Sequence, residues 1–371
     1  MTPEQGVEAP HVVELPQIID PPSQLPGDTR LPNGAEPLAA GAAATAFSAI
    51  FDGLVDHDEL AAFLTALARR GETAIEVAAA ARALRARAHT IEAPAGAIDV
   101  CGTGGDGRHT LNISTAVAIV VAACGVPVAK HGNRAASSRS GAADVLEALG
   151  IRTDVPHATV ERSIAALGIG FLHAPRHHAA MAQVASVRRA LGIRTIFNLL
   201  GPLANPAGVS RQLVGVFDRR WLTPFAEALR ELGSDAAMVV HGSDGLDELT
   251  VTGPSRVAEL RGGSICEYDI TPADAGLGLH PAAALTGGDP AHNAAALTAL
   301  LGGAPGAYRD IVLLNAAAAL IIADDHAASD RRVAGGGSAA SDSWRLSAAR
   351  AASAIDSGAA RALVQRWKEF A

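Results

Sequence analysis

Short runs of apolar residues alternate with helix-length segments along most of the chain, from residue 97 onward. A connection of that length lets the chain leave one strand, form a helix and return to the same edge of a sheet, so successive strands run parallel. The alternation therefore predicts an α/β domain with a mostly parallel central sheet, and such sheets bind ligands outside the carboxyl ends of their strands. The runs predicted as strands are residues 98–101, 126–129, 213–217 and 236–240.

A helical pattern precedes this domain. Between residues 46 and 88, apolar residues such as Leu60, Leu64 and Leu67 recur at the spacing of one helix face. The pattern predicts a small helical domain over residues 46–94, joined by part of residues 176–200. Eight of the 20 prolines fall before residue 40, and no stretch there keeps a helical or strand period, which predicts a flexible extension over residues 1–45.

The large domain is expected to cover residues 95–371 and to close with helices. One segment between two of these helices, residues 331–343, is rich in Gly, Ser and Ala, which predicts a mobile surface loop. The closing helices are predicted at residues 291–301, 308–323 and 343–370.

Charge and cysteine content exclude several classes of protein. The formal net charge is −8, whereas nucleic-acid-binding proteins usually concentrate basic residues, so no nucleic acid is expected as a partner. The three cysteines form no Cys-x-x-Cys pair, which argues against a disulfide framework or a zinc site and fits the reducing cytoplasm. No apolar run reaches the length of a bilayer span and no secretory signal is seen, so no membrane contact is expected.

A glycine-rich turn follows the first predicted strand and leads into a helix. It has the sequence Gly-Thr-Gly-Gly-Asp at residues 102–106, and Thr110, Asn112, Ser114 and Thr115 follow at the expected helix start. Glycines let backbone N–H groups close around an anion, and the free N–H groups and dipole of a helix start favour phosphate. We therefore predict a phosphate or pyrophosphate site, although Asn112 or Ser114 could equally be a plain helix cap. The turn matches neither the P-loop nor the dinucleotide-binding pattern.

A lysine stands at the carboxyl end of the second predicted strand. The chain has only two lysines, Lys130 and Lys368, against 28 arginines. A compact ammonium group acts on phosphate as a point charge, which the guanidinium of arginine does not copy. Lys130 is therefore predicted to bind the same anion, with a solvated surface lysine as the alternative. His131 and Asn133 share its loop and alone would indicate only a turn.

Two adjacent acids, Asp247 and Glu248, follow the last predicted strand. A loop can turn both carboxylates toward a hard cation, and Mg²⁺ typically takes one or two carboxylates together with substrate phosphate oxygens. The pair is therefore a candidate magnesium site, and two exposed acids on a turn are the alternative. Arg188 lies at a helix end before Gly192, where an arginine is ordinarily a partner of the helix dipole. Its planar fork would suit a substrate carboxylate.

Together these motifs resemble the anthranilate phosphoribosyltransferase family of tryptophan biosynthesis. The similarity runs from about residue 63 to the C-terminal helices, and residues before 46 do not match. It rests on motifs that occur in the family's order, namely Gly-Thr-Gly-Gly-Asp, Asn-Ile-Ser-Thr, Lys-His-Gly-Asn-Arg, Gly-Pro-Leu-x-Asn-Pro and Asp-Glu.

The resemblance implies a fold of the nucleoside phosphorylase and phosphoribosyltransferase type, a homodimer formed through the helical domain, and two Mg²⁺ ions per subunit. The donor would be phosphoribosyl pyrophosphate (PRPP) and the acceptor the amino group of anthranilate. Lys130, Arg188 and His131 would be catalytic, with Arg188 on the anthranilate carboxylate; the magnesium ligands would be Ser114, Asp247 and Glu248. The residues implied to hold the substrates are Gly102, Gly105, Asp106, Thr110, Asn112, Ser114, Thr115, Lys130, Asn133, Ser137, Ser138, Ala142 and Arg188.

Two other functions remain as alternatives. A pyrimidine nucleoside phosphorylase shares this architecture, but it carries a differently spaced Lys-His-Ser-Thr-Gly-Gly type signature that this chain lacks. A non-catalytic, nucleic-acid-binding relative of the fold would be expected to have a basic groove and to lose the Asp-Glu pair.

Overall fold

A seven-stranded sheet forms the centre of the computed structural model, which describes residues 30–135, 139–324 and 338–370. The strand order is β3-β2-β1-β4-β5-β6-β7, in which β1 to β5 pair in parallel and β6 and β7 continue the sheet antiparallel. The predicted α/β class with a mostly parallel sheet is thus confirmed. The strands are β1 (Ile98–Gly102), β2 (Val128–Gly132), β3 (Ile169–His173), β4 (Arg211–Gly215), β5 (Ala236–Gly242), β6 (Ser255–Arg261) and β7 (Ser264–Ile270).

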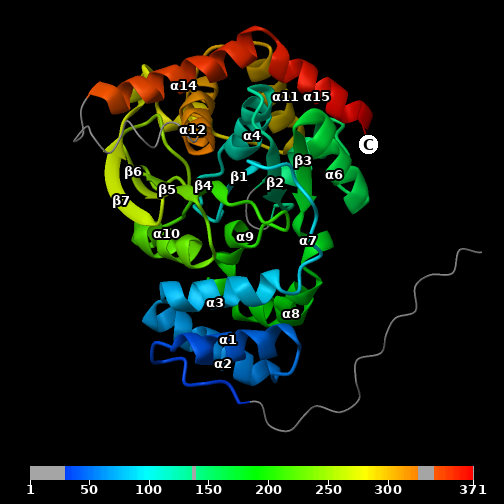
Figure 1. Cartoon of the computed structure of the whole chain (residues 1–371), viewed down its shortest axis with the longest axis vertical. Helices are drawn as coiled ribbons and strands as arrows, with labels where there is room; N and C mark the ends of the chain where they lie inside the picture. Colours follow the sequence, from blue (N-terminus) through cyan, green and yellow to red (C-terminus); the bar gives the residue numbers. More distant parts are fainter. Residues whose placement is uncertain (1–29, 136–138, 325–337, 371) are drawn as a thin grey trace, which may run out of the picture.

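Alternate residues of the strands face two separate apolar cores. On β5, Met238 and Val240 belong to one core, whereas Ala237 and Val239 belong to the other. Helices therefore cover both faces of the sheet (Figure 1). Strands that are buried on both faces have continuous apolar sequences, which is why the sequence revealed most of the parallel ones. The first core includes α4 (Ile113–Ala123) and α12 (Ala307–Ala323), and the second includes α10 (Leu222–Glu231).

The sequence did not reveal β3 or the β6–β7 hairpin. The hairpin turns at Gly262 and Gly263, whose φ angles of +55° and +77° are suited to a two-residue turn. Most residues of β7 are at least partly exposed, and among the described strands it is one of the two at the edges of the sheet. Such a strand lacks the continuous apolar run on which the prediction depended.

The strand order reverses between β1 and β4, at the centre of the sheet. Connections leaving neighbouring strands at such a point diverge and leave a crevice at the carboxyl ends. Gly102 and Gly215 pair there as the last residues of β1 and β4. The glycine turn at residues 102–106 therefore begins at the crevice.

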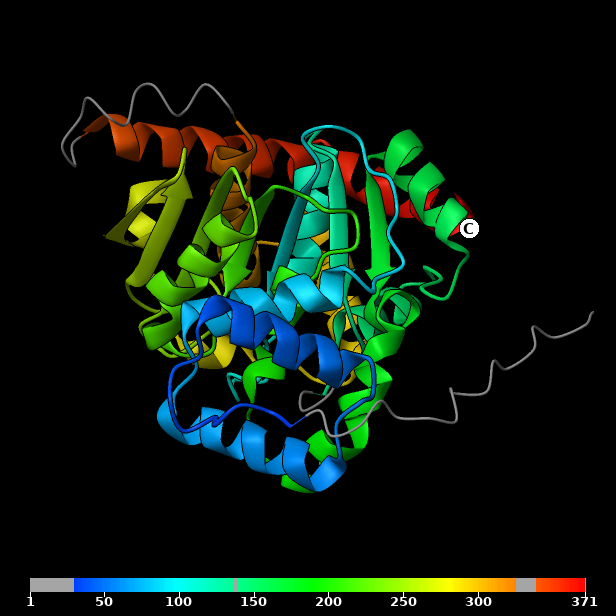
Figure 2. The same ribbon diagram turned by 60° about the horizontal axis from the view of Figure 1, so that its bottom comes forward.

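Four helices form a layer beside the sheet, in the lower part of Figure 1 and also visible in Figure 2. The fourth comes from later in the chain and packs against the first two. Phe47 and Phe63 meet edge to face inside the layer, with ring centroids 6.1 Å apart. The helices are α1 (Ala40–Phe51), α2 (His57–Arg70), α3 (Ala74–Arg85) and α8 (Ala182–Leu191).

The layer begins earlier than the sequence predicted. Helix α1 begins at Ala40 rather than at residue 46, and the backbone N–H of Leu38 donates to Glu76 Oε1 of α3 at 2.9 Å. The predicted flexible extension is therefore wrong for residues 30–45, while residues 1–29 lie outside the described part. Ala39, at the N-cap position, has no side-chain oxygen to mark the helix start, which hid the boundary from the sequence.

The C-terminal helices are also divided differently from the prediction. Residues 343–370 do not form one helix, because Gly358 adopts a φ of +78° between α14 and α15. Residues 338–343 of the predicted loop belong to α14, and residues 331–337 lie outside the described part. None of the described helices is long and apolar enough to cross a membrane. The remaining α-helices are α5 (Ala142–Ala148), α6 (His157–Leu167), α7 (Ala174–His177), α9 (Leu200–Leu203), α11 (Pro290–Leu301), α14 (Ser338–Asp356) and α15 (Ala359–Phe370).

Candidate active site

The glycine turn and the acidic loop after β5 touch across the crevice. A Cβ on Gly102 would lie 2.5 Å from Asp247 Oδ2, and one on Gly215 would lie 1.6 Å from the Asp247 carbonyl oxygen. Any side chain at these two positions would push the acidic loop away. Glycines at the ends of β1 and β4 thus allow Asp247 to reach the turn, where Gly104 N–H donates to its Oδ2 at 2.8 Å.

The turn presents unpaired backbone N–H groups. No described residue accepts a hydrogen bond from the N–H of Gly105, Asp106 or Gly107. Gly105 and Gly107 adopt φ angles of +77° and +73°, which glycine reaches without strain. Successive free N–H groups of this kind can surround an anion, so the turn has the backbone geometry that the predicted phosphate site requires.

The start of α4 does not use Asn112 as a cap. Asn112 occupies the N-cap position, but its Nδ2 donates to Ser140 O at 3.1 Å and its Oδ1 accepts from Asn293 Nδ2 at 2.8 Å. The Oγ1 of Thr115 is buried and has no partner among the described residues. Thr110, four residues after the glycine turn, pairs through its backbone with Thr286. Of these described polar side chains, Thr115 is therefore the one that has an unpartnered atom at the helix start.

Lys130 is a buried cation and not a surface lysine. Its side chain is 2 % exposed, and Nζ donates to Val100 O at 2.7 Å and to Ser114 Oγ at 3.3 Å. Its ammonium group lowers the pKa values of the nearby Asp99 and Glu248, although burial raises both by more. The structure thus brings Lys130, Ser114 and the acidic pair together.

The positive charge near Asp247 and Glu248 does not offset the effect of burial on their pKa values. Burial raises the pKa of Glu248 from its ordinary 4.5 to about 8, against the opposing attraction of Lys130. Burial, Asp106 and Glu248 raise the pKa of Asp247 well above its usual range. Carboxyl groups buried in this way favour a bound cation, because a cation restores their ionised form.

The donor groups fit a magnesium ion that is shared with a phosphate ligand. The backbone N–H of Ser114 donates to the carboxyl group of Glu248. The Ser114 residue therefore lies beside the acidic pair, Asp247 and Glu248. Among the described residues, no three His, Cys, Asp or Glu side chains are close enough to hold a metal without other ligands. Mg²⁺ usually completes its shell with water and substrate phosphate, so an incomplete protein set is what this ion would use.

Lys130 and His131 lie within β2 rather than in the loop where the sequence placed them, and the loop that follows β2 is fixed at both ends by the start of α5. Asp144 Oδ2 accepts from the N–H groups of Ala135 and Gly141, both at 2.8 Å. Asn133 is exposed beside these anchors, and Ala142 is the first residue of α5. The predicted residues Ser137 and Ser138 lie outside the described part.

His131 is a neutral, buried imidazole. Its Nδ1 donates to Gly201 O at 3.0 Å, and its Nε2 has no partner among the described residues. Burial and the neighbouring His178 lower its pKa to about 3. The two rings meet edge to face with centroids 5.1 Å apart. His131 is thus suited to accept a hydrogen bond but is a poor proton acceptor.

Arg188 lies on α8, as predicted, with its guanidinium 5.8 Å from the Phe197 ring centroid. No described contact joins it to the glycine turn. The segment after α8 does reach the turn, because Arg194 donates to Gly105 O. Sequence reasoning missed Arg194, since nothing local distinguishes it from other arginines.

A further residue that the sequence did not assign is Asn315 of α12. Its side chain accepts from Leu249 N–H at 3.0 Å and donates to Leu249 O at 2.8 Å, next to Glu248. Its place in a mostly apolar helix was the available signal.

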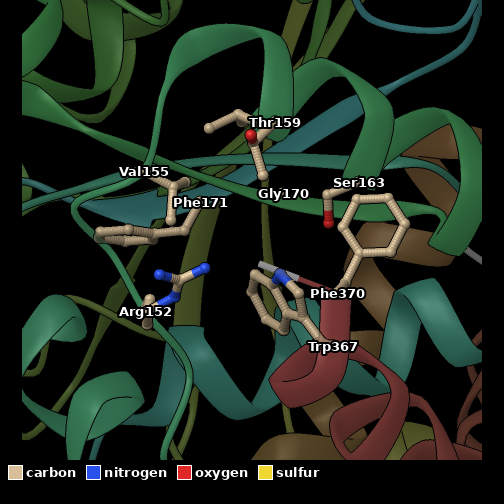
Figure 3. A pocket seen from close by; sticks show the side chains of 9 residues that line it. Arg152, Val155, Thr159, Ser163, Gly170, Phe171, Trp367 and Phe370 are labelled. Atoms are coloured by element: carbon tan, nitrogen blue, oxygen red, sulfur yellow. The ribbon is translucent and has the colours of Figure 1, made fainter. Parts of the chain in front are cut away.

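The pocket in Figure 3 contains none of the predicted residues. It is lined by Arg152, Phe171, Trp367, Phe370 and residues of α6, among others.

Comparison with known proteins decides the family. A protein-family sequence model described as "Glycosyl transferase family, a/b domain" matches residues 94–361. A second one, for the helical bundle domain of the same family, matches residues 29–88. A protein of Rhodospirillum rubrum named anthranilate phosphoribosyltransferase is 57% identical over 330 residues, covering 89% of this chain and 91% of that protein. The chain belongs to the anthranilate phosphoribosyltransferase family. The match from residue 29 corrects the expectation that residues before 46 have no counterpart.

Solved structures of family members are similar along nearly the whole chain. Anthranilate phosphoribosyltransferase from Thermus thermophilus is 43% identical with a TM-score of 0.81, and covers 91% of this chain and 96% of its own. The enzyme from Saccharomyces cerevisiae, in complex with PRPP and Mg, is 28% identical with a TM-score of 0.78, over 90% and 93% of the two chains.

Proposed function

We propose that this chain transfers the 5-phosphoribosyl group from PRPP to the amino group of anthranilate, in tryptophan biosynthesis. The products are N-(5-phosphoribosyl)anthranilate and pyrophosphate. The observation that supports this most strongly is the meeting of three elements at one crevice. These are the free N–H groups of the glycine turn, the buried Lys130, and the acidic pair with its raised pKa values.

The donor is proposed to bind at the glycine turn with two Mg²⁺ ions per subunit. Ser114, Asp247 and Glu248 are the proposed ligands, and the family member solved with PRPP and Mg supports the choice of ion. Bound there, magnesium would neutralise phosphate charge and stabilise the departing pyrophosphate. The residues proposed to hold the donor are Gly102, Gly105, Asp106, Thr110, Asn112, Ser114, Thr115, Lys130, Asn133, Ser137, Ser138 and Ala142.

Lys130 is proposed to stabilise charge that develops during the reaction. The bond from ribose C1 to the pyrophosphate oxygen breaks, and negative charge collects on the leaving group. A buried ammonium, already fixed by Val100 O, stabilises that charge without having to reorganise. The sugar becomes oxocarbenium-like, and the acceptor nitrogen forms the new bond to C1.

The acceptor is proposed to be positioned by Arg188 and His131. Arg188 would bind the anthranilate carboxylate, and Nε2 of neutral His131 would accept a hydrogen bond from the amino group. Holding the nitrogen opposite the leaving group supplies much of the acceleration. The amine becomes strongly acidic once it is bonded to carbon, so its proton can pass to water without a strong base.

We also propose that the chain works as a homodimer, formed through the helical layer, in the cytoplasm. The described part holds its three cysteines as free thiols, which suits a reducing compartment. Light scattering on the purified chain measures the mass, and a monomer would contradict the dimer.

The activity is tested by mixing the chain with Mg²⁺, PRPP and anthranilate and following the loss of anthranilate fluorescence. The expected result is a decline that needs all three components and is abolished in the Asp247→Ala, Glu248→Ala double variant. A folded chain that leaves anthranilate unchanged but cleaves pyrimidine nucleosides with phosphate would overturn the proposal.

A further inference from the structure

Arg194 has no part in the proposed chemistry, yet it contacts the donor turn. It lies in the segment that joins α8 to a short helical turn (Ile196–Asn198). Its Nη2 donates to Gly105 O, and its Cζ lies 4.3 Å from the Phe217 ring centroid. A Cβ on Gly105 would lie 3.6 Å from Nη2, so the guanidinium packs against the backbone of the turn.

We propose that Arg194 is a positioning residue that sets the orientation of the peptide between Gly105 and Asp106. In a trans peptide the carbonyl and the following N–H point in opposite directions. Fixing Gly105 O on Arg194 therefore turns the Asp106 N–H to the other side, where it is free for an anion. The same orientation keeps the partly negative carbonyl oxygen of Gly105 away from a phosphate bound at the turn.

The peptide between Gly105 and Asp106 makes no other backbone hydrogen bond to the described residues. Glycine populates positive and negative φ almost equally, so the peptide beside Gly105 can rotate at low cost. No described residue bonds the N–H groups of Gly105, Asp106 or Gly107, so Gly105 O provides the nearest fixed point.

Arg194 is itself held by Phe217, which lies two residues after the end of β4. Its guanidinium stacks on Phe217, and Phe217 N–H donates to Thr103 Oγ1 at 3.0 Å. Thr103 belongs to the same glycine turn. The turn, Phe217 and Arg194 thus form a closed set of contacts, and the set joins the turn to the segment that follows α8.

The inference rests on the proposed function and is tested with Arg194→Ala, Arg194→Lys and the control Arg189→Ala. Arg189 is a neighbouring exposed arginine with no described contact at the turn. Loss of a charged hydrogen bond predicts that Arg194→Ala raises the KM for PRPP about 10-fold to 100-fold. The KM for anthranilate and the melting temperature should change little. Arg194→Lys should restore part of the PRPP affinity, and Arg189→Ala should match the wild type.

Calorimetric titration of each variant with PRPP and Mg²⁺, without acceptor, separates this inference from the proposed function. If the wild type binds PRPP but transfers nothing to anthranilate, the proposed function fails while the binding comparison still tests Arg194. Wild-type PRPP affinity in Arg194→Ala would overturn the inference. A rise in the KM for anthranilate alone would also overturn it. So would a rise in the KM for PRPP that comes with a drop in melting temperature and is not reduced in Arg194→Lys.

Discussion

Replacing Glu248 by Gln should stabilise the metal-free protein at alkaline pH. Glu248 is 7 % exposed, and burial raises its pKa to about 8 from an ordinary 4.5, despite the attraction of Lys130. The folded carboxyl therefore keeps its proton over a range in which the unfolded one has lost it. Its contribution to stability is complete below about pH 4.5 and is lost as the pH rises to about 8. The difference between the two pKa values corresponds to a loss of at most about 5 kcal/mol.

The assay is urea unfolding in EDTA at about pH 5 and about pH 9. Over this interval the wild type should lose free energy of unfolding that Glu248→Gln retains, so the variant should be more stable at pH 9 by about 2–5 kcal/mol. Exposed Glu92 provides the matched control, and Glu92→Gln should follow the wild type at both pH values.

Lower stability of Glu248→Gln at about pH 9 would refute the reasoning. It would mean that the attraction between Glu248 and Lys130 outweighs the cost of burying the carboxylate, so that the site needs no further cation. With Mg²⁺ and both substrates, the same variant should show little or no turnover.

Three further substitutions have separate expected results in steady-state kinetics. Lys130→Ala removes the buried cation beside Ser114 and should lower kcat about 100-fold to 1,000-fold; a change below about threefold would exclude charge stabilisation by Lys130. Arg188→Ala should raise the KM for anthranilate about 10-fold to 100-fold and leave that for PRPP unchanged; the reverse pattern would move Arg188 to the donor side. Asn315→Ala should destabilise the chain by about 1–3 kcal/mol and weaken Mg²⁺ activation, because it releases the backbone next to Glu248. Unaltered Mg²⁺ dependence would limit Asn315 to a structural role.

The sequence was sufficient for the parts of the fold that local pattern controls. The parallel strands β1, β2, β4 and β5 are largely buried, and each overlaps a short, mostly apolar run of the sequence. The edge strand β7 has no such run, and the start of α1 has no capping side chain. The sequence therefore did not reveal β7, and it placed the start of the helical layer too late.

The candidate site likewise divides into residues that the local sequence pattern indicated and residues that it did not. The glycine turn follows β1, Lys130 lies near the carboxyl end of β2, and the acidic pair lies in the loop after β5, so their positions along the chain indicated one edge of the sheet. Arg194 and Asn315 contact that edge across separations of 89 and 66 residues. Such contacts depend on how helices pack on the sheet, which no local pattern records.

A crystal structure with PRPP and Mn²⁺, an anomalous scatterer that replaces Mg²⁺, is the most direct test of a shared donor site. The pyrophosphate should lie within hydrogen-bond distance of the backbone N–H groups at residues 105–107 and of Lys130 Nζ. Metal density should adjoin Asp247 and Glu248. Pyrophosphate bound away from the crevice, or metal density remote from both acids, would contradict the account.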